Sequence, residues 1–444
     1  MIGDTIVAPA TPPGYGGVSL IRISGPHSKS IAKKITGLNS LENRRSTFTA
    51  IQDRAVKIDD VLVSFFKNPF SYTGEDVVEL SCHGNPVIVD QILNLLYKKG
   101  ARLADPGEFT KRAFLNGKLD LVQAESVSCL IGARSTKAAE LNQRVLSGAL
   151  SAKLQTIKGD LLDVLAELEF EFDISEEDLL MPDLVGRSIC TLNNNRLDCA
   201  ALVESFKEGS MYNNGSRVVI YGNPNVGKST LLNALLEKDR AITSHIPGTT
   251  RDTVDAQIML DGIPVTLVDT AGVRETNSSI EAAGVSRSLH EAEMADLLLH
   301  VVDVDSDFYD NEYPIDNIQD KHYFTIRNKC DLERPKKEFK GVFFISALRG
   351  DGINNLKKAI KNKLIDMNCT GSDFILTTRR QVSAINSCEQ NIKKAVYQLR
   401  SKRPELEIVY FEIREAVKNL DGLFGKTSVD EILNRVFSKF CVGK

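Results

Sequence analysis

Residues 222–229 read Gly-Asn-Pro-Asn-Val-Gly-Lys-Ser, the pattern of a loop that binds phosphate through its backbone. Gly222 and Gly227 permit a tight turn in which N–H groups converge on an anion. We expect Lys228 to reach the β- and γ-phosphates of a nucleotide and the Ser229 hydroxyl to bind Mg²⁺. The loop therefore predicts phosphoryl-transfer chemistry on a nucleoside triphosphate.

The segment Asp269-Thr270-Ala271-Gly272 supplies a second part of the same chemistry. It follows the apolar run Val265 to Val268, which places the Asp269 carboxylate at a strand tip beside the Mg²⁺. Gly272 can then offer its N–H to the γ-phosphate. The loop and this segment together predict a metal-assisted triphosphate site.

Two later segments contain residues suited to binding a purine base. Asn328-Lys329-Cys330-Asp331 ends a strand-like run that begins at Tyr323. Asp331 can accept from the two N–H groups on a guanine edge, which adenine does not present in that pattern. Ser346 and Ala347 follow another strand-like run and are expected to close over the base. The four segments, in this order, predict GTP rather than ATP as the substrate.

Strand-like and helix-like runs explain how these segments meet. Arg217 to Tyr221 is a short β-branched run typical of a buried strand, and Ser229 to Leu236 has the apolar spacing of a helix. The phosphate loop therefore lies at a strand-to-helix turn. This alternation predicts a Ras-like α/β domain over residues 215–370.

A nucleotide-sensing switch is expected between the loop and Asp269, at Ser244 to Asp252. Thr250 should reach Mg²⁺ through its hydroxyl and the γ-phosphate through its N–H. The complete predicted GTP-binding set is Asn225, Val226, Gly227, Lys228, Ser229, Thr230, Ser244, His245, Ile246, Pro247, Gly248, Thr249, Thr250, Asp269, Thr270, Ala271, Gly272, Asn328, Lys329, Asp331, Ser346, Ala347 and Leu348.

The 444 residues should hold about three domains. Residues 1–118 are rich in short β-type runs and predict a compact α+β unit. Residues 119–210 and 371–444 have helical periodicity, and each block alone offers few partners for its apolar stripe. The predicted fold class is thus multidomain α+β and α/β, with one discontinuous helical domain interrupted by the inserted nucleotide domain.

The net charge of −4 and the pI near 6.0 argue against broad, non-specific nucleic-acid binding, so any RNA contact must be local or shared with a partner. The nearest candidate is the group Lys393, Lys394, Arg400, Lys402 and Arg403. Its simpler interpretation is the solvated face of a helix.

The opening residues lack a basic region followed by an apolar core, and no apolar run reaches transmembrane length. We therefore expect a cytoplasmic protein with no membrane segment. The eight cysteines are scattered without a C-x-x-C pair, which favours reduced thiols over a disulfide framework or a zinc site.

The pattern G-x-P-N-x-G-K-S with Gly248-Thr249-Thr250-Arg251-Asp252 resembles the TrmE-Era-EngA-like branch of translation-factor-class GTPases. Four further stretches narrow the resemblance: Thr5 to Gly25, Ser71 to Leu80, Pro106 to Leu121 and the terminal Cys441-Val442-Gly443-Lys444. With them, the chain is similar over essentially its full length to the MnmE (TrmE) family of tRNA-modifying GTPases.

The resemblance implies that K⁺ occupies the place where many GTPases receive an arginine finger. It assigns the Asn225 side chain as a K⁺ ligand, with further oxygen atoms from Ser244, Ile246 and Thr249. A cation there would neutralise charge that develops between the β- and γ-phosphates.

The candidate catalytic residues are Lys228, Arg251, Glu281 and Cys441. Glu281 lies twelve residues after Asp269 and matches the family glutamate that orients or polarises the attacking water. Arg251 has two interpretations, as an internal arginine finger or as a structural or coupling residue of the switch.

The N-terminal unit resembles the family's tetrahydrofolate-binding, dimer-forming domain. Arg22, Glu79 and Lys118 match positions that hold the folate, and Lys444 joins them from the carboxyl end. A pterin edge can donate to a carboxylate, and a glutamate tail can be held by Arg or Lys. Cys441 is interpreted as a reactive or positioning thiol near the folate.

Two positions depart from the family pattern. Tyr15 stands where the family has an arginine, which puts a charge contact from that loop in doubt. Leu348 stands where Lys or Arg is usual, so we expect the base contacts there to come from the backbone.

The resemblance implies a homodimeric, K⁺-dependent GTPase that acts on tRNA with a flavin-dependent partner, MnmG (GidA), in a heterotetramer-type complex. A one-carbon unit from 5-formyl- or methylene-tetrahydrofolate would enter a carboxymethylaminomethyl-type group at C5 of the wobble uridine. Two alternatives stay open: a ribosome-associated assembly or signalling GTPase without modification activity, and an N-terminal unit that only dimerises.

Overall fold

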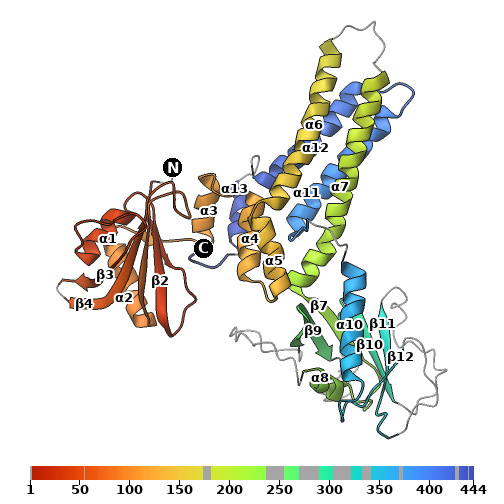
Figure 1. Cartoon of the computed structure of the whole chain (residues 1–444), viewed down its shortest axis with the longest axis horizontal. Coiled ribbons are helices and arrows are strands. Elements are labelled where there is room, and N and C mark those ends of the chain that lie inside the picture. Colours follow the sequence, from red (N-terminus) through yellow and green to blue (C-terminus); the bar gives the residue numbers. More distant parts are fainter. Residues whose placement is uncertain are drawn as a thin grey trace, which may run out of the picture. The chain divides into compact units, whose positions relative to one another are not determined.

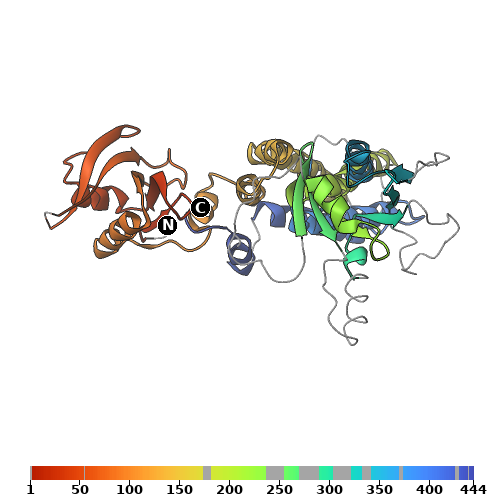
Figure 2. The ribbon, with the colours of Figure 1, turned by 90° about the horizontal axis from the view of Figure 1, so that it is seen from below.

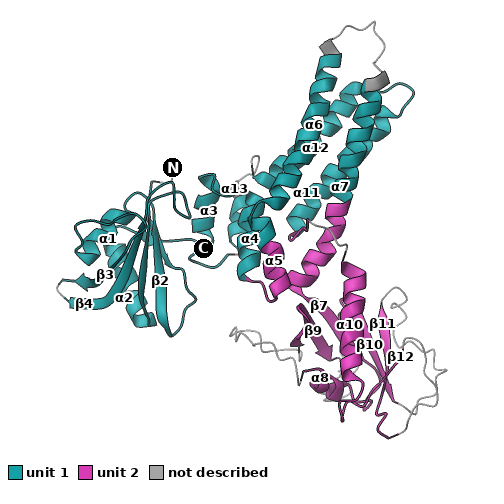
Figure 3. Cartoon of the chain, viewed as in Figure 1, with its two compact units in different colours: residues 1–131, 143–200, 379–444 teal, residues 132–142, 201–378 magenta. Residues whose placement is uncertain are grey.

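The computed structural model describes residues 3–54, 56–173, 182–236, 255–269, 290–303, 322–332, 342–369, 374–425, 430–438 and 440–444. The chain divides into two compact units (Figure 3). The first comprises residues 1–131, 143–200 and 379–444, and the second comprises residues 132–142 and 201–378.

The first unit begins with a six-stranded sheet (Figures 1 and 2). Its strands are β1 (Ile6–Pro9), β2 (Gly16–Ser24), β3 (Ser46–Asp53), β4 (Val56–Phe66), β5 (Val77–Gly84) and β6 (Arg102–Leu103), in the spatial order β3-β4-β5-β2-β1-β6. All neighbours are antiparallel except β1 and β6. Helices α1 (Ser28–Thr36) and α2 (Pro86–Lys98) pack on this sheet, because their apolar stripes need cover.

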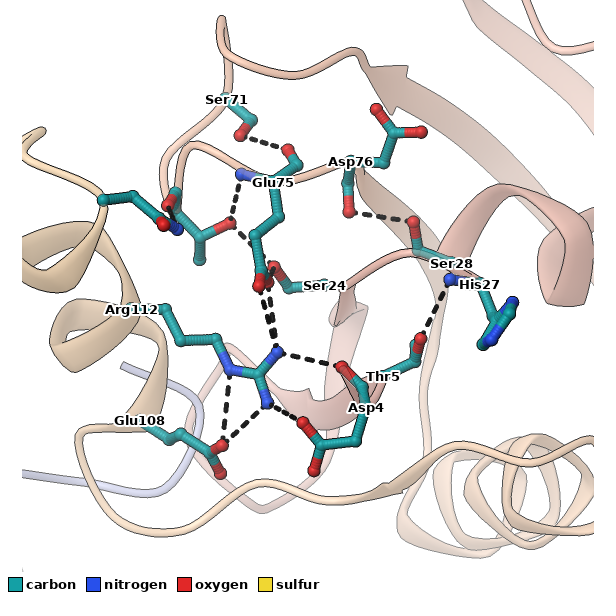
Figure 4. A network of polar contacts seen from close by, with 12 residues as sticks. Asp4, Thr5, Ser24, His27, Ser28, Ser71, Glu75, Asp76, Glu108 and Arg112 are labelled. Carbon is teal, nitrogen blue, oxygen red and sulfur yellow. Dashed lines mark hydrogen bonds and ion pairs between the residues drawn. The ribbon is translucent and has the colours of Figure 1, made fainter. Parts of the chain in front are cut away.

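A buried arginine ties the start of this domain to helix α3 (Glu108–Leu115), as Figure 4 shows. Arg112 is 1% exposed and its guanidinium donates to Asp4 Oδ1 at 2.8 Å, Glu75 Oε2 at 3.1 Å and Glu108 Oε1 at 2.9 Å. Arg102 also donates to Asp4 and Glu108. A buried guanidinium is tolerated here because carboxylates surround it.

The helical part of the first unit comes from two stretches of the chain, one before and one after residues 201–378. Its helices are α4 (Leu121–Ile131), α6 (Ala149–Asp173), α11 (Arg379–Leu399), α12 (Leu406–Phe424) and α13 (Asp430–Phe437), with parts of α5 (Thr136–Leu146) and α7 (Pro182–Asn214). Helices α6, α7, α11 and α12 run alongside one another (Figure 1). The apolar positions that define the stripe of α6 are buried, as their three- and four-residue spacing predicts: Leu154, Ile157, Leu161, Leu165 and Leu168.

An ion pair joins the two halves of this helical domain. Arg380 Nε on α11 donates to Glu125 Oε1 on α4 at 2.6 Å, and Gln381 Nε2 donates to Glu125 Oε2 at 2.9 Å. The Arg380 guanidinium also donates to the carbonyls of Gly422 and Leu423, at the end of α12. A cation on the last carbonyls of a helix satisfies acceptors that have no partner within the helix.

The second unit contains the inserted α/β domain. Its strands are β7 (Ser216–Tyr221), β8 (Asp255–Leu260), β9 (Ile263–Asp269), β10 (Leu297–Asp303), β11 (Tyr323–Asn328) and β12 (Val342–Phe344), in the order β12-β11-β10-β7-β9-β8. All neighbours are parallel except β8 and β9. Helices α8 (Lys228–Leu236) and α10 (Ile353–Asn368) belong to the same domain.

The predicted fold class is confirmed: an N-terminal α+β domain, a discontinuous helical domain and an inserted Ras-like α/β domain. Among the described helices, none is both long enough and apolar enough to cross a membrane.

Candidate functional site: the nucleotide edge and the N-terminal cluster

The sheet of the second unit gathers the predicted nucleotide-binding segments at one edge. Strand β7 has β9 on one side and β10 on the other, so the chain reverses its direction of winding at β7. In such sheets, ligands bind where the carboxyl ends of the strands meet at this reversal. The phosphate loop follows β7, Asp269 ends β9 and Asn328 ends β11, so all three lie along that edge.

The side chain of Lys228 is held in place by the backbone of the phosphate loop. Its ammonium donates to the carbonyls of Gly222 and Asn223, both at 2.8 Å. The side chain is buried, and burial lowers the pKa of the ammonium, with the charge of Asp269 acting in the opposite sense. An ammonium has three donors, and the two carbonyls use two of them. Lys228 is thus positioned by the loop and retains capacity for a phosphate oxygen.

Ser229 and Asp269 bring two oxygen atoms together beside the loop. The Ser229 hydroxyl donates to Asp269 Oδ2 at 2.7 Å, and the Asp269 side chain is buried. Hydroxyl and carboxylate oxygens are the ligands that Mg²⁺ prefers. The donor set therefore fits the metal that the sequence predicts, with Ser229 to bind it and Asp269 to orient that hydroxyl.

Gly227 shows why the loop needs glycine. Its φ is 94°, and a Cβ on it would lie 2.3 Å from Asn328 Nδ2. Asn328 uses that nitrogen to donate to the Val226 carbonyl at 2.9 Å, while its Oδ1 accepts from Ala347 N–H at 3.0 Å. Asn328 therefore links the phosphate loop to the loop after β12 through hydrogen bonds, and a side chain at residue 227 would disrupt that link.

The predicted base-binding residues lie together at the ends of β11 and β12. The Ser346 hydroxyl donates to Asp331 Oδ1 at 2.6 Å, and this hydrogen bond is the main reason that the pKa of Asp331 is lowered. Asp331 is thus an ionised acceptor, as recognition of a guanine edge requires. Lys329 forms an ion pair with Asp303 at the end of β10. Leu348 is 80% exposed.

A second cluster of predicted site residues lies in the first unit. Arg22 and Glu79 face each other across β2 and β5, and Arg22 Nε donates to Glu79 Oε1 at 2.9 Å. The Arg22 guanidinium also lies 5.2 Å from the ring centre of Tyr72 and 5.8 Å from that of Phe109. An aromatic floor of this kind holds the ion pair in a partly desolvated place.

The C-terminal residues join this cluster. The Lys444 carbonyl accepts from Phe109 N–H at 3.2 Å. Burial, then the charge of Arg22, lower the pKa of the Lys444 ammonium, while Cys441 and Glu79 act in the opposite sense. The tail comes this close because residue 443 is glycine: a Cβ there would lie 1.9 Å from the Pro9 carbonyl oxygen. The structure therefore brings Arg22, Glu79 and Lys444 together.

Lys118 and Cys441 differ from these three. The Lys118 ammonium donates to the Pro69 carbonyl at 3.1 Å, and none of its described hydrogen bonds is to the cluster. Lys118 instead lines a cavity of about 360 Å³ together with Phe114 and Phe424. Cys441 is exposed and its carbonyl accepts from Lys444 N–H at 3.3 Å. Tyr15 is 85% exposed.

Two family models match the chain, one described as "GTP-binding protein TrmE N-terminus" over residues 5–118 and one as "MnmE helical domain" over residues 121–441. The chain belongs to the MnmE family of tRNA modification GTPases. The "tRNA modification GTPase MnmE" of Thermotoga petrophila is 39% identical, and the match covers 99% of this chain and 100% of the relative. The protein of the same description from Thermosipho melanesiensis is 40% identical over the same shares.

Among solved structures, the FeoB G-domain from Methanococcus jannaschii is 26% identical over 34% of this chain and 97% of that chain, with a TM-score of 0.26. Like the two MnmE relatives, which match it over their full length, this MnmE-family chain is an enzyme that hydrolyses GTP.

Several predicted residues of this MnmE-family site lie outside the described residues. These are Ser244, His245, Ile246, Pro247, Gly248, Thr249, Thr250, Arg251, Thr270, Ala271, Gly272 and Glu281. Their roles stay predictions. Conversely, sequence reasoning missed Asn328 as a fastener of two loops and Tyr72 and Phe109 as the floor under Arg22. The available signal was that Tyr72 lies within the Ser71 to Leu80 stretch and Phe109 within the Pro106 to Leu121 stretch, both of which carry the family resemblance.

Proposed function

We propose that this chain is a K⁺-dependent GTPase that modifies the wobble uridine of certain tRNAs with a flavin-dependent partner, MnmG (GidA). The observation that carries the proposal is the pairing of two sites in one chain. A GTPase of the tRNA modification family also holds a compact Arg22, Glu79 and Lys444 cluster in its N-terminal domain. A homodimer, the partner complex and a tetrahydrofolate one-carbon donor complete the proposal.

The nucleotide edge supports the hydrolytic half. Lys228 would hold phosphate oxygens, and Ser229 would bind Mg²⁺, which when bound neutralises charge on the phosphates. Asp331 would select guanine. Of the proposed K⁺ ligands, Asn225 is the described one, and its φ of 65° is a left-handed conformation that asparagine tolerates. Thr250 for Mg²⁺ and Glu281 for the water complete the set from the sequence.

The N-terminal cluster supports the folate half. It combines an acceptor, two cations and aromatic rings, which suit the pterin edge, the acidic tail and the flat ring of a folate respectively. Lys118 is retained as a fourth candidate although it contacts Pro69 here. Cys441 would act as a thiol near the one-carbon unit.

The test of the whole proposal is a modification assay. The full chain, the flavoprotein partner, tRNA, GTP, K⁺ and methylene-tetrahydrofolate are combined, and new wobble-uridine nucleosides are measured by mass spectrometry. We expect a modified uridine that depends on every component. No new nucleoside in a mixture where an authentic family member works would contradict the proposal. Co-sedimentation with ribosomal subunits without folate binding would favour the ribosome-associated alternative.

The folate half has its own test. Calorimetry with 5-formyl-tetrahydrofolate should detect binding to the full chain and a large loss in the Arg22→Ala variant. Arg45→Ala is the matched control, because Arg45 is an exposed arginine of the same domain paired with Glu42. Absence of binding by the wild type would support an N-terminal unit that only dimerises.

A further inference from the structure

The exposed side of helix α11 has an unusual composition. We define the α11 face as the exposed residues Ser383, Asn386, Gln390, Lys393, Lys394 and Tyr397. Their three- and four-residue spacing places them on one side of the helix. The opposite side is buried in the helical domain, so packing fixes which side faces solvent. The 21 residues of α11 make this face roughly 30 Å long.

The α11 face carries no acidic side chain of its own, although Lys394 pairs at 3.5 Å with Glu412 on the neighbouring helix α12. The single acidic residue of α11, Glu389, is half-buried and accepts from Arg196 at 3.3 Å. Solvated helix faces in general mix both signs and form pairs three or four residues apart. The exposed side of α12 does so, with Lys418 paired to Glu415 at 3.2 Å. The α11 face therefore differs from the ordinary solvated helix that the sequence alone suggests.

Positive charge continues beyond the end of the helix. Arg400, Lys402 and Arg403 are exposed in the turn that follows α11. Residues 379–403 hold seven basic side chains and one acidic one, and of the basic ones Arg380 pairs with Glu125 on α4, in a chain whose formal net charge is −4. Tyr397 lies between the lysines and Arg400 and is 79% exposed. An aromatic ring left in water amid cations has no packing role on its own helix.

We propose that the α11 face, with the turn after it, binds the phosphodiester backbone of tRNA, and that Tyr397 stacks on an unpaired base. Lysines neutralise phosphates, while serine, asparagine and glutamine side chains donate to phosphate and ribose oxygens. Exposed aromatic rings in basic surroundings are stacking platforms for single-stranded bases. The inference rests on tRNA as the substrate in the proposed function and adds the surface that holds it.

Charge complementarity favours RNA over the other partners. A membrane surface requires an apolar stripe, and Tyr397 is the one large apolar group on the α11 face. An acidic protein surface would satisfy the lysines but leaves the exposed ring without a flat partner. Binding of the flavoprotein partner to the α11 face is therefore not proposed, and the test below would detect it.

The test is fluorescence anisotropy of labelled, unmodified tRNA with the full chain, from about 50 to 200 mM KCl. The Lys393→Gln/Lys394→Gln variant should bind about tenfold more weakly near 0.1 M salt, and its salt dependence should be shallower by one to two, roughly one unit for each lost phosphate contact. Arg414→Gln/Lys418→Gln is the matched control, because it removes two exposed charges from the neighbouring helix. The control should keep wild-type affinity within about twofold.

Two substitutions of Tyr397 test whether its ring, and not its hydroxyl, contributes to tRNA binding. Tyr397→Ala should weaken tRNA binding about fivefold or more, and Tyr397→Phe should keep it, because stacking needs the ring and not the hydroxyl. GTP hydrolysis without tRNA should be unchanged in all these variants, which verifies that they fold.

The proposal is overturned if the lysine and tyrosine variants bind tRNA as the wild type does, or if the control loses as much affinity. It is also overturned if the variants lose the flavoprotein partner and keep tRNA. A wild type that binds tRNA through the α11 face but yields no modified uridine would count against the proposed function alone. Failure of the proposed tRNA-binding surface and failure of the proposed function thus give different results.

Discussion

The substitution Arg112→Met is expected to lower the free energy of unfolding of the N-terminal domain by about 3–5 kcal/mol. Methionine fills much of the same volume, so the cavity it leaves is small. The larger cost is electrostatic, because Asp4, Glu75 and Glu108 lose the cation between them. Arg102 continues to neutralise Asp4 and Glu108 but has no described contact with Glu75.

The measurement is hydrogen exchange of the full chain in increasing denaturant, followed by mass spectrometry of peptides from each domain. Peptides from β2 and α3 should exchange at lower denaturant in the Arg112→Met variant, and peptides from β7 and α8 should not change. Arg45→Met is the control, since Arg45 also pairs with a glutamate but its side chain is 68% exposed. We expect no resolvable effect there, because exposed pairs contribute little. Equal effects of the two substitutions would refute the reasoning that burial makes the Arg112 network important.

Four further results are expected. Gly227→Ala should abolish nucleotide binding in calorimetry with GDP, since its Cβ would lie 2.3 Å from Asn328 Nδ2 at a φ of 94°; retained affinity would contradict the close approach. Asp331→Asn should weaken GTP binding at least tenfold, roughly the contribution of a charged hydrogen bond, and shift preference toward xanthosine triphosphate, measured by competition; unchanged guanine preference would remove Asp331 from the base site. Asn225→Ala should make hydrolysis rates equal in Na⁺ and K⁺, and persistent K⁺ stimulation would show that the assigned ligand is wrong. In the Glu108→Gln variant, the stability of the N-terminal domain should fall less steeply with pH below about pH 4, as measured by hydrogen exchange of peptides from β2 and α3. An unchanged pH dependence in this range would contradict the network's role.

The sign of the last prediction follows from the pKa values of two carboxyls. Burial alone would raise the pKa of Asp4 and of Glu108, but hydrogen bonds from Arg102 and Arg112 outweigh it and hold both pKa values below their usual range. Groups of this kind stabilise the folded domain above their unfolded pKa, near 4, and the stabilisation is lost as the pH falls through the lower, folded values. Acidification therefore weakens the domain, and Glu108→Gln removes part of that dependence.

Local patterns predicted the elements that carry the nucleotide site. The β-branched run Arg217 to Tyr221 lies in β7, and the apolar spacing from Ser229 to Leu236 lies in α8. These predictions succeed because a strand, a glycine turn and a helix are each specified by neighbours in the sequence. In α12 the spacing of Val409, Ile413 and Val417 likewise marks the buried side.

Distant contacts were beyond the reach of the sequence. Arg112 meets Asp4 across 108 residues, and nothing near either residue indicates the other. The hydrogen bond from Lys118 to the Pro69 carbonyl was likewise not predictable, since a family motif gives positions but not contacts. The basic group at residues 393–403 was noticed, but the absence of acidic residues from its exposed side emerges only once packing shows which side is buried.

The ion pair between Arg380 and Glu125 also bears on how the protein is made. These residues lie 255 positions apart, on either side of the inserted nucleotide domain. At synthesis rates of about 5–20 residues per second, Glu125 leaves the ribosome some 10–50 seconds before its partner. During that interval, the apolar side of α6 lacks its packing partner α12, while the nucleotide domain can fold first. A nascent chain of this design has to keep an unfinished helical surface from aggregating until its last helices arrive.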